Sequence, residues 1–270
     1  MTVWILAVTA LAAAGFSARW NWWRKKLDGI PVLMYHKIGI APANSQLKKL
    51  WVSPDRFARQ VDWLLKKGYT PIHFADLDRA VKGEAELPEK PVLITFDDGY
   101  KNNYRHAYPV LKERNAKGNI FLVHNTVGKS NLWHDPASEA WIEMLTWEQI
   151  GEMLASGVFD VGSHTMNHAS LPLIDSNTAE WEIRESKKQL EEKLGREIPA
   201  FAYPYGAGAF DPQIRKFALD AGYRFDFSVK QGLLPWHWKP ADGTIRRLFI
   251  RGDDTMLDFA LAVTRGKSRF

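Results

Sequence analysis

The sequence predicts an α/β fold in which parallel strands form a barrel, and three observations support this. Short apolar runs alternate with longer amphipathic segments, as strands and helices do in α/β domains. Most of the runs are apolar nearly throughout, which is typical of parallel strands buried on both faces. Polar residues capable of chemistry follow the ends of several runs. In a barrel those ends form one rim, whereas a doubly wound sheet, which the alternation also allows, would spread them along a line.

Seven runs are expected to be strands, because they are short, apolar and rich in β-branched and aromatic residues. They span residues 31–36, 91–96, 119–123, 159–163, 200–204, 224–229 and 246–250. Asp97 and Asp98 follow the second run, His164 the fourth, Tyr205 the fifth and Arg251 the seventh. We therefore expect these five side chains to lie at one rim of the barrel, where barrel enzymes build their sites.

Helices are expected between the strands, because the intervening segments carry start and stop signals. The clearest start is Thr146, which forms a capping-box pattern with Gln149. The expected helices run from Pro54 to Gly68, from Thr146 to Gly157, from about Thr178 to Gly195, and through "DPQIRKFALDAG". The acidic pair Asp253–Asp254 is interpreted as the N-terminus of one more helix before "TMLDFALAV", since carboxylates favour that end of the helix dipole.

Composition excludes some functions. The net charge of +5 and the pI of about 9.2 are only mildly basic. Because there is no dense run of lysine and arginine, we expect no nucleic-acid partner. The chain has no cysteine, which excludes disulfides, thiolate metal sites and a cysteine nucleophile.

The N-terminus differs from the rest of the chain. "TVWILAVTALAAAGFSA" is uncharged and, at about 17 residues, is just long enough to span a bilayer core. "RWNWWRKK" follows it and resembles the aromatic and basic belt of a membrane interface. We expect an anchor over residues 1–19, a juxtamembrane segment over 20–30 and the main domain over 31–265. A cleaved signal peptide and a shallow interfacial segment remain alternatives.

This segment predicts membrane lipid as a partner and a location at a bacterial-type inner membrane. The positive-inside rule would place the cations that follow the apolar stretch, and with them the main domain, in the cytoplasm. The rule is weak for a first segment this short, so the side of the membrane stays open.

Two histidines and an aspartate doublet indicate a candidate metal site with a free acid beside it. His164 and His168 are four residues apart, so on a helical turn both imidazoles would face one ion. The doublet Asp97–Asp98 ends a strand and precedes a glycine. Each pattern alone is common in loops and turns. Together, two histidines and one carboxylate make a three-ligand catalytic zinc set, and the ion would stabilise acids that otherwise repel. The second aspartate is then free to take a proton.

At these residues the chain resembles a known family. "TFDDG" (95–99), "SHTMNH" (163–168) and "YPYG" (203–206) are similar to successive motifs of the NodB-type polysaccharide deacetylases, carbohydrate esterase family 4. "VLMYHKIG" (32–39) and "LTWEQIGEM" (145–153) are also similar to stretches of that family. The resemblance covers roughly residues 31–255.

The resemblance implies a distorted (β/α)7 barrel of the NodB type and metal-dependent removal of N-acyl groups, usually acetyl, from amino sugars. It implies that Asp97 is the general base and that Asp98, His164 and His168 bind the metal. It also implies that the backbone N–H of Tyr205 helps to hold the oxyanion. By ligand type the ion is expected to be Zn2+, with Co2+, Ni2+ or Fe2+ as alternatives.

The chain departs from the family pattern in two places. Where many members carry an arginine that orients the base, this chain has Ala202. Many members also use a late histidine as general acid, but no histidine follows His237. His36, at the end of the first strand, is a candidate acid, and a buried structural histidine is an equal interpretation. The missing cation is expected from Arg251.

Three side observations complete the candidate residues. Arg247 could also supply the missing cation, but it is interpreted as surface charge. His237, in "PWHWKP", could belong to a sugar-stacking surface. His124 and His134 are interpreted as structural or exposed.

The leading hypothesis is a deacetylase that acts on an N-acetylated amino sugar of a cell-envelope polysaccharide or a lipid-linked saccharide. The alternative is a catalytically weak carbohydrate-binding relative, which the two departures motivate. A metal phosphodiesterase is poorly supported, because the sequence has no second cluster of metal ligands and no phosphate-binding glycine loop.

Overall fold

The computed structural model describes residues 2–20 and 22–268, and a parallel sheet lies at its centre. Its main strands follow the order β10-β1-β5-β6-β7-β8-β9, and every neighbouring pair is parallel. These strands are β1 (Val32–Tyr35), β5 (Pro91–Phe96), β6 (Gly118–Leu122), β7 (Phe159–Ser163), β8 (Ala200–Ala202), β9 (Phe225–Phe227) and β10 (Leu248–Phe249). Each of them lies in, or within one residue of, one of the seven runs expected from the sequence.

Three further strands complete the β-structure. β4 (Thr70–Pro71) pairs with β5, and β2 (Lys37–Ile38) pairs with β3 (Trp51–Val52) in a separate small sheet. All three are only two residues long, too short for their apolar pattern to predict a strand.

The main sheet curls, so that its two ends approach each other. Phe227 in β9 forms a parallel bridge with Ile245, which lies just before β10. The N–H of Ser228 donates to the carbonyl oxygen of Ile245 at 2.8 Å. A curled parallel sheet of this order agrees with a NodB-type (β/α) barrel and not with a flat, doubly wound sheet.

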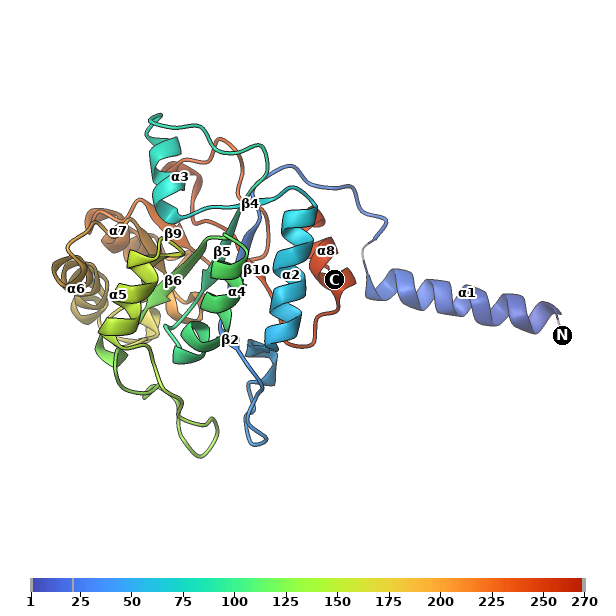
Figure 1. Ribbon diagram of the computed structural model, residues 1–270, viewed down its shortest axis with the longest axis horizontal. Helices are drawn as coiled ribbons and strands as arrows, with labels where there is room; N and C mark the ends of the chain where they lie inside the picture. Colours follow the sequence, from blue (N-terminus) through green and yellow to red (C-terminus); the bar gives the residue numbers. More distant parts are fainter. Residues whose placement is uncertain (1, 21, 269–270) are drawn as a thin grey trace.

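Helices surround the sheet (Figure 1). They are α2 (Pro54–Lys66), α3 (Phe74–Val81), α4 (Tyr108–Glu113), α5 (Trp147–Ala155), α6 (Ser176–Leu194), α7 (Pro212–Asp220) and α8 (Met256–Arg265). The capping box at α5 is confirmed, because Thr146 Oγ1 accepts from the N–H of Gln149 and Gln149 Oε1 accepts from the N–H of Thr146. α6 begins slightly earlier than expected, because Asp175 caps its first turn.

The helix expected directly after the acidic pair Asp253–Asp254 is confirmed as α8. The N-cap of α8 is Thr255, which forms a capping box with Asp258. Asp254 instead accepts a hydrogen bond from the N–H of Arg251 at 2.9 Å, and Asp253 forms an ion pair with the Arg251 guanidinium at 2.7 Å. The acidic pair therefore lies just before the helix start, as expected, and closes the preceding turn, while Thr255 provides the cap.

Both faces of the central strands are buried, as their continuous apolar sequences predict. In β5, Ile94 and Phe96 belong to the large core beneath the helices, whereas Leu93 belongs to a second cluster. That second cluster also holds Phe121 and Phe227 from β6 and β9. The residues that follow the carboxyl ends of these strands are therefore attached to strands packed on both faces.

The N-terminal helix, α1 (Thr2–Arg19), extends away from the body of the molecule (Figure 1). Its base is held by Asp258, which pairs with the Arg19 guanidinium at 3.0 Å and accepts from Trp20 Nε1 at 3.0 Å. Across residues 2–20 and 22–268, no helix has both the length and the apolarity needed to cross a bilayer.

Candidate active site

The candidate site lies at the carboxyl ends of the central strands. Asp97 and Asp98 directly follow β5, and His164 directly follows β7. Tyr205 comes three residues after β8, in the 3₁₀ turn Pro204–Gly206. Because these strands are parallel members of one sheet, their carboxyl ends share one edge, as the sequence predicted.

Asp98, His164 and His168 converge. Asp98 Oδ1 lies 3.3 Å from His164 Nε2 and 3.2 Å from His168 Nε2. All three side chains are buried, and their candidate ligand atoms lie within 4.8 Å of one another. Burial raises the pKa of Asp98, but the imidazoles of His168 and His164 outweigh it and hold the pKa well below its usual value.

The donor set suits a divalent metal ion. Asp98 Oδ1 is buried, and no described residue donates a well-directed hydrogen bond to it. His164 Nδ1 lies 2.7 Å from the carbonyl oxygen of Ala202, which orients the ring and leaves Nε2 free to face an ion. One carboxylate and two imidazoles match a catalytic zinc site with an open position.

The local geometry of the histidines differs from the expectation. Residues 164–168 form no helical turn; the chain turns through left-handed conformations at Thr165 (φ 69°) and His168 (φ 60°). The N–H of His168 donates to Thr165 Oγ1 at 3.0 Å, and Glu182 on α6 accepts from two other backbone N–H groups of this loop. The two imidazoles meet because the loop is pinned in this shape, and not because of helical spacing.

Backbone strain gathers at this rim. Of the five non-glycine residues with positive φ in the described chain, four surround the site: Asp98, Thr165, His168 and Tyr205. Such conformations cost about 1–3 kcal/mol each and persist only where the surroundings enforce them. Their concentration here indicates that the positions of these side chains matter more than local backbone stability.

Asp97 is held by a second charged group, Arg247. The Arg247 guanidinium donates to both carboxylate oxygens of Asp97, at 2.6 and 2.8 Å, and both side chains are buried. Burial raises the pKa of Asp97, but the Arg247 charge outweighs it and lowers the pKa. Arg247 Nε also donates to the carbonyl oxygen of Ser228 at 3.0 Å.

Two arginine interpretations were therefore wrong. Arg247 is fully buried and is not surface charge. Arg251, expected to supply the missing cation, is partly exposed and pairs with Asp253. One signal could have identified Arg247: it lies two residues after the buried Ile245 in an extended segment, and alternate residues of such a segment share a face.

Two other predicted residues reach the same rim. His36 directly follows β1, and its Nδ1 is buried with no hydrogen-bond partner among the described residues. Burial lowers the pKa of His36, while Asp98 and Asp97 act in the opposite direction. The Tyr205 side chain is exposed, and its ring lies edge-on to His168 with centroids 4.6 Å apart.

His237 does not reach the rim. It shares a surface hollow with Ile30 and Leu234, whose backbones pair just before β1 begins. It therefore lies near the amino end of β1, opposite the end where His36 lies. The structure does not bring it together with the other candidate residues.

Several residues at the site were not predicted. The Trp133 ring stacks on His168 with centroids 4.3 Å apart. The Tyr100 hydroxyl is buried without a hydrogen-bond partner among the described residues, and burial, followed by Asp98, raises its pKa well above the usual value. Lys37 Nζ lies 4.8 Å from the centroid of the Tyr100 ring and pairs with Glu139 at 3.2 Å. Tyr100 is two residues after Asp98, and Lys37 directly follows His36. This proximity to predicted site residues is the sequence feature that could have identified them.

The family model for polysaccharide deacetylase matches residues 84–225, more than half of the chain. YxkH of Bacillus subtilis, whose name carries the same family description, is 30% identical over 203 residues, which are 75% of this chain and 65% of that protein. The poly-β-1,6-N-acetyl-D-glucosamine N-deacetylase of Staphylococcus epidermidis is 27% identical over 202 residues, 72% of this chain and 66% of that protein. The chain thus spans just under two thirds of the length of these relatives.

Solved structures of polysaccharide deacetylases are also similar to this chain. A polysaccharide deacetylase from Bacillus cereus superposes with a TM-score of 0.72 at 30% identity, over 88% of this chain and 69% of that chain. IcaB from Ammonifex degensii superposes with a TM-score of 0.70 at 29% identity, over 89% of this chain and 97% of that chain. The likeness includes nearly all of the barrel.

Proposed function

Because the chain belongs to the polysaccharide deacetylase family, we propose that it is a metal-dependent hydrolase that removes N-acetyl groups from an amino sugar. The substrate class is a cell-envelope polysaccharide or a lipid-linked saccharide. One observation carries the proposal: a buried carboxylate fixed by an arginine lies in sequence next to a buried carboxylate that meets two imidazoles. This combination provides a base and a metal site at one rim.

Asp98, His164 and His168 would hold the divalent ion, for which zinc is the best match by ligand type. When bound, the ion would supply Lewis-acid chemistry, polarising the acetamide carbonyl and lowering the pKa of water. The hydrogen bond between His164 Nδ1 and the Ala202 carbonyl orients one ligand in advance.

Asp97 is proposed to take the proton from the attacking water. A general base must be ionised before it acts, and the Arg247 pair keeps Asp97 ionised and fixes both of its oxygens. Arg247 is then a positioning residue, in the role that an arginine of the third motif fills in many relatives and that Ala202 cannot fill. The pairing also lowers the basicity of Asp97, so precise placement must compensate.

The backbone N–H of Tyr205 is proposed to donate to the developing oxyanion. The left-handed conformation of Tyr205 and the packing of its ring against His168 support this assignment, because they fix the backbone beside the metal ligands. His36 is proposed to protonate the leaving amine, and its position directly after β1, at the rim, supports the choice. Burial lowers the pKa of His36, and the charges of Asp98 and Asp97 oppose this and favour the protonated ring.

The test is an activity screen with the purified chain. Amine release is measured from N-acetylated oligosaccharides and from a polyprenyl-linked N-acetylhexosamine, before and after chelation and after zinc is added back. We expect release from at least one substrate class, loss on chelation and recovery with zinc. Binding without release from every substrate would contradict the proposal and favour a carbohydrate-binding relative. The presence of Ala202 was one reason for considering a catalytically weak relative. Arg247 removes that reason, because its guanidinium contacts Asp97 in place of the arginine that many relatives carry at the Ala202 position.

We also propose that the N-terminal segment contacts a membrane. The side chains of Trp4, Leu6 and Leu11 on α1 are 77%, 65% and 73% exposed, and apolar side chains so exposed suit a lipid surface. The substitution Leu6→Lys with Leu11→Lys is expected to lower the share of protein that floats with lipid vesicles. An unchanged share would contradict the contact.

A further inference from the structure

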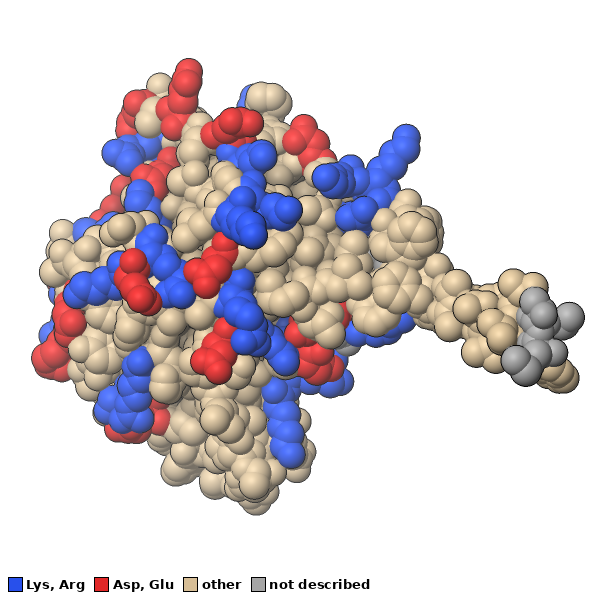
Figure 2. Space-filling view, turned by 45° about the vertical axis from the view of Figure 1, so that its right-hand side comes forward, with Lys and Arg blue, Asp and Glu red and all other residues tan. Residues whose placement is uncertain are grey.

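A groove with a volume of about 650 Å³ lies between α2, α8 and the segment after α1. Its lining includes the cations Lys26, Lys67, Lys90 and Arg265, and no acidic residue. No carboxylate of the described residues lies within ion-pair distance of the three lysines, whereas the Arg265 guanidinium donates to the carbonyl oxygens of Trp22 and Arg24. Figure 2 shows basic side chains near the base of the projecting helix, around a largely uncharged surface. The groove is therefore built to receive negative charge.

The same groove offers aromatic surface. Trp22, Trp63 and Tyr69 line it, and the rings of Trp63 and Tyr69 stack with centroids 6.3 Å apart. The edge of Trp63 also packs on Phe259 of α8, which holds it in place. Tryptophan and tyrosine favour the boundary between lipid headgroups and acyl chains. A ligand that matches both features has an anionic head and an apolar body.

We propose that this groove is a docking site for the phosphate headgroup of an anionic membrane lipid. The position of α1 supports a lipid over a soluble phosphate compound. The base of α1 is fixed to α8 through Asp258, and residues of α8 also line the groove. The exposed apolar side chains of α1 therefore begin next to the basic groove. One lipid surface can contact both, which adds charge attraction to apolar burial.

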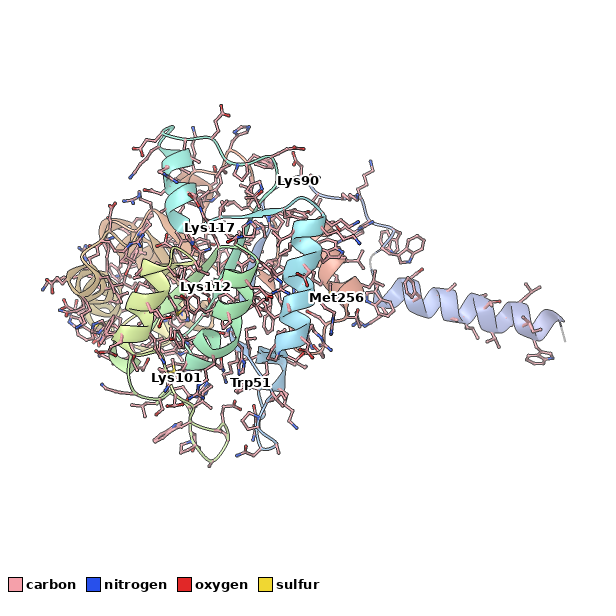
Figure 3. The ribbon with its side chains drawn as sticks, viewed as in Figure 1. Trp51, Lys90, Lys101, Lys112, Lys117 and Met256 are labelled. Carbon is pink, nitrogen blue, oxygen red and sulfur yellow. The ribbon has the colours of Figure 1, made fainter. Side chains whose placement is uncertain are left out.

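The groove is separate from the catalytic rim. Lys90 directly precedes β5 and Asp97 directly follows it, so they lie about 23 Å apart at about 3.3 Å per residue. Figure 3 shows Lys90 and Lys101, which follows the acid doublet, toward opposite ends of the molecule. A lipid in the groove therefore holds the protein at the membrane while the catalytic rim faces away from the bilayer.

The test compares binding of the full chain to vesicles of phosphatidylcholine alone and of phosphatidylcholine with phosphatidylglycerol. The groove variant is Lys67→Gln with Lys90→Gln. The matched control is Lys188→Gln with Lys216→Gln, which removes two exposed lysines of α6 and α7. The groove variant should partition about 25-fold more weakly to the anionic vesicles, since each cation near such a surface contributes a factor of about five. The control should bind like the unmodified chain.

Three outcomes would overturn the proposal. The groove variant could bind like the control, or the unmodified chain could bind neutral and anionic vesicles alike. Inorganic phosphate or glycerol 3-phosphate could also displace the chain from vesicles at low concentration, which would assign the groove to a soluble anion. Amine release from a soluble substrate should be equal in the groove variant and the control, so this proposal and the deacetylase proposal can fail separately.

Orientation has its own readout, because the chain contains no cysteine. A nitroxide on Leu257→Cys, at an exposed residue that lines the groove, should become protected from a water-soluble collision reagent when anionic vesicles are added. A nitroxide on Trp141→Cys should stay accessible, since this exposed residue lines a hollow with Lys101 near the catalytic rim. Protection at position 141 in place of position 257 would overturn the proposal.

Discussion

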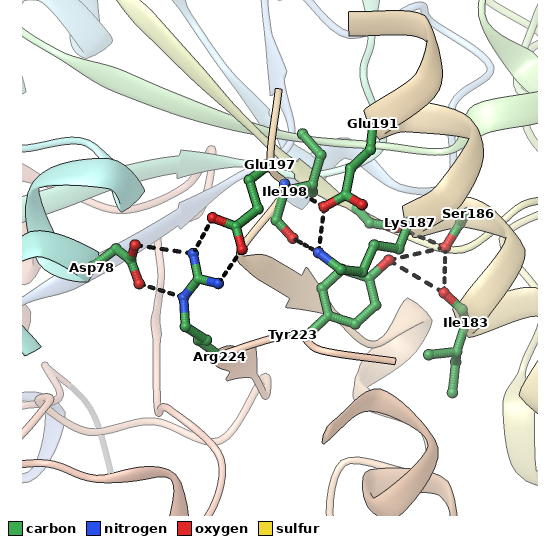
Figure 4. Close-up of polar contacts among 10 residues, drawn as sticks. Asp78, Ile183, Ser186, Lys187, Glu191, Glu197, Ile198, Tyr223 and Arg224 are labelled. Carbon is green, nitrogen blue, oxygen red and sulfur yellow. Dashed lines mark hydrogen bonds and ion pairs between the residues drawn. The ribbon is translucent and has the colours of Figure 1, made fainter. Parts of the chain in front are cut away.

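Two arginine–carboxylate clusters in this molecule have similar chemistry, but they differ in how fully their polar groups are hydrogen-bonded. In the first, Arg224 donates to both Asp78 and Glu197, and neighbouring Lys187 donates to Glu191 and to the carbonyl oxygen of Ile198 (Figure 4). Every polar group drawn there has a partner. In the second, Arg247 and Asp97 are hydrogen-bonded to each other, but several buried polar groups beside them have no hydrogen-bond partner among the described residues.

Of the ten buried side-chain atoms without a hydrogen-bond partner among the described residues, four belong to residues at the rim beside the second cluster. Asp98 Oδ1, His168 Nδ1, His36 Nδ1 and the Tyr100 hydroxyl are buried without a hydrogen-bond partner among the described residues. Each such group costs about 1–3 kcal/mol, and the strained backbone at Asp98 and His168 adds to this. The Arg224 cluster is complete and joins α3 to the segments that precede β8 and β9. Under the proposed function, the groups beside Arg247 lack partners because they would contact a metal ion and a substrate.

Removing a metal ligand should have the largest effect. Asp98→Ala or His164→Ala is expected to lose bound zinc and to lower kcat/KM by roughly a thousandfold or more, because Lewis-acid stabilisation is worth several kcal/mol and each 1.4 kcal/mol is tenfold. Metal analysis and amine release measure this. Glu197→Gln in the complete cluster is the control and should keep both; a variant at Asp98 that retains zinc would contradict the ligand assignment.

Asp97→Asn should separate the base from the metal. The amide keeps the size of the side chain but cannot accept the proton, so kcat should fall by about 10²–10⁴-fold while zinc stays bound. Activity near that of the unmodified chain would show that Asp97 is not the base.

The third prediction compares the two arginines directly. Arg247→Ala leaves a buried carboxylate without its partner and should destabilise the fold by about 3–5 kcal/mol, whereas Arg224→Ala, at a partly exposed site, should cost about 1 kcal/mol. Chemical denaturation measures both. Arg247→Lys keeps the charge but not the paired donors, so it should fold well enough for kinetics.

The pH profile of Arg247→Lys tests the positioning role. Arg247 lowers the pKa of Asp97, so a weaker pair should raise that pKa and move the acid limb of kcat/KM to higher pH. Arg224→Lys should leave this limb in place. Equal shifts in both variants would mean that Arg247 acts only on stability.

The last prediction concerns a pH effect on α3, which also carries Asp78 of the complete cluster. Burial raises the pKa of Asp76, but hydrogen bonds, the Lys117 ammonium first, outweigh it and lower the pKa from 3.8 to about 2. The stabilisation is therefore complete above pH 3.8 and is lost as the pH falls toward 2, by about 1–2 kcal/mol after allowance for solvent screening. Asp76→Asn should flatten the pH dependence of unfolding in this window; an unchanged slope would contradict the assignment.

Much of the fold was predictable because its signals are local. Thr146 and Gln149 cap α5 through bonds that span three residues, and Gly195 ends α6 in the left-handed conformation. The apolar runs mark the seven main strands because parallel strands are buried on both faces. The pairs formed by β2, β3 and β4 were missed because they are two residues long and depend on neighbours distant in sequence.

By itself, the sequence determined where the seven main strands form and which residue types can do chemistry at their ends. Only the tertiary structure decided that Arg247 and not Arg251 meets Asp97, that Thr165 and His168 turn left-handed, and that Trp133 stacks on His168. The physical reason is range. Caps and apolar runs depend on residues a few positions apart, whereas the Asp97–Arg247 pair joins side chains 150 positions apart and depends on how the curled sheet brings β5 and the approach to β10 together.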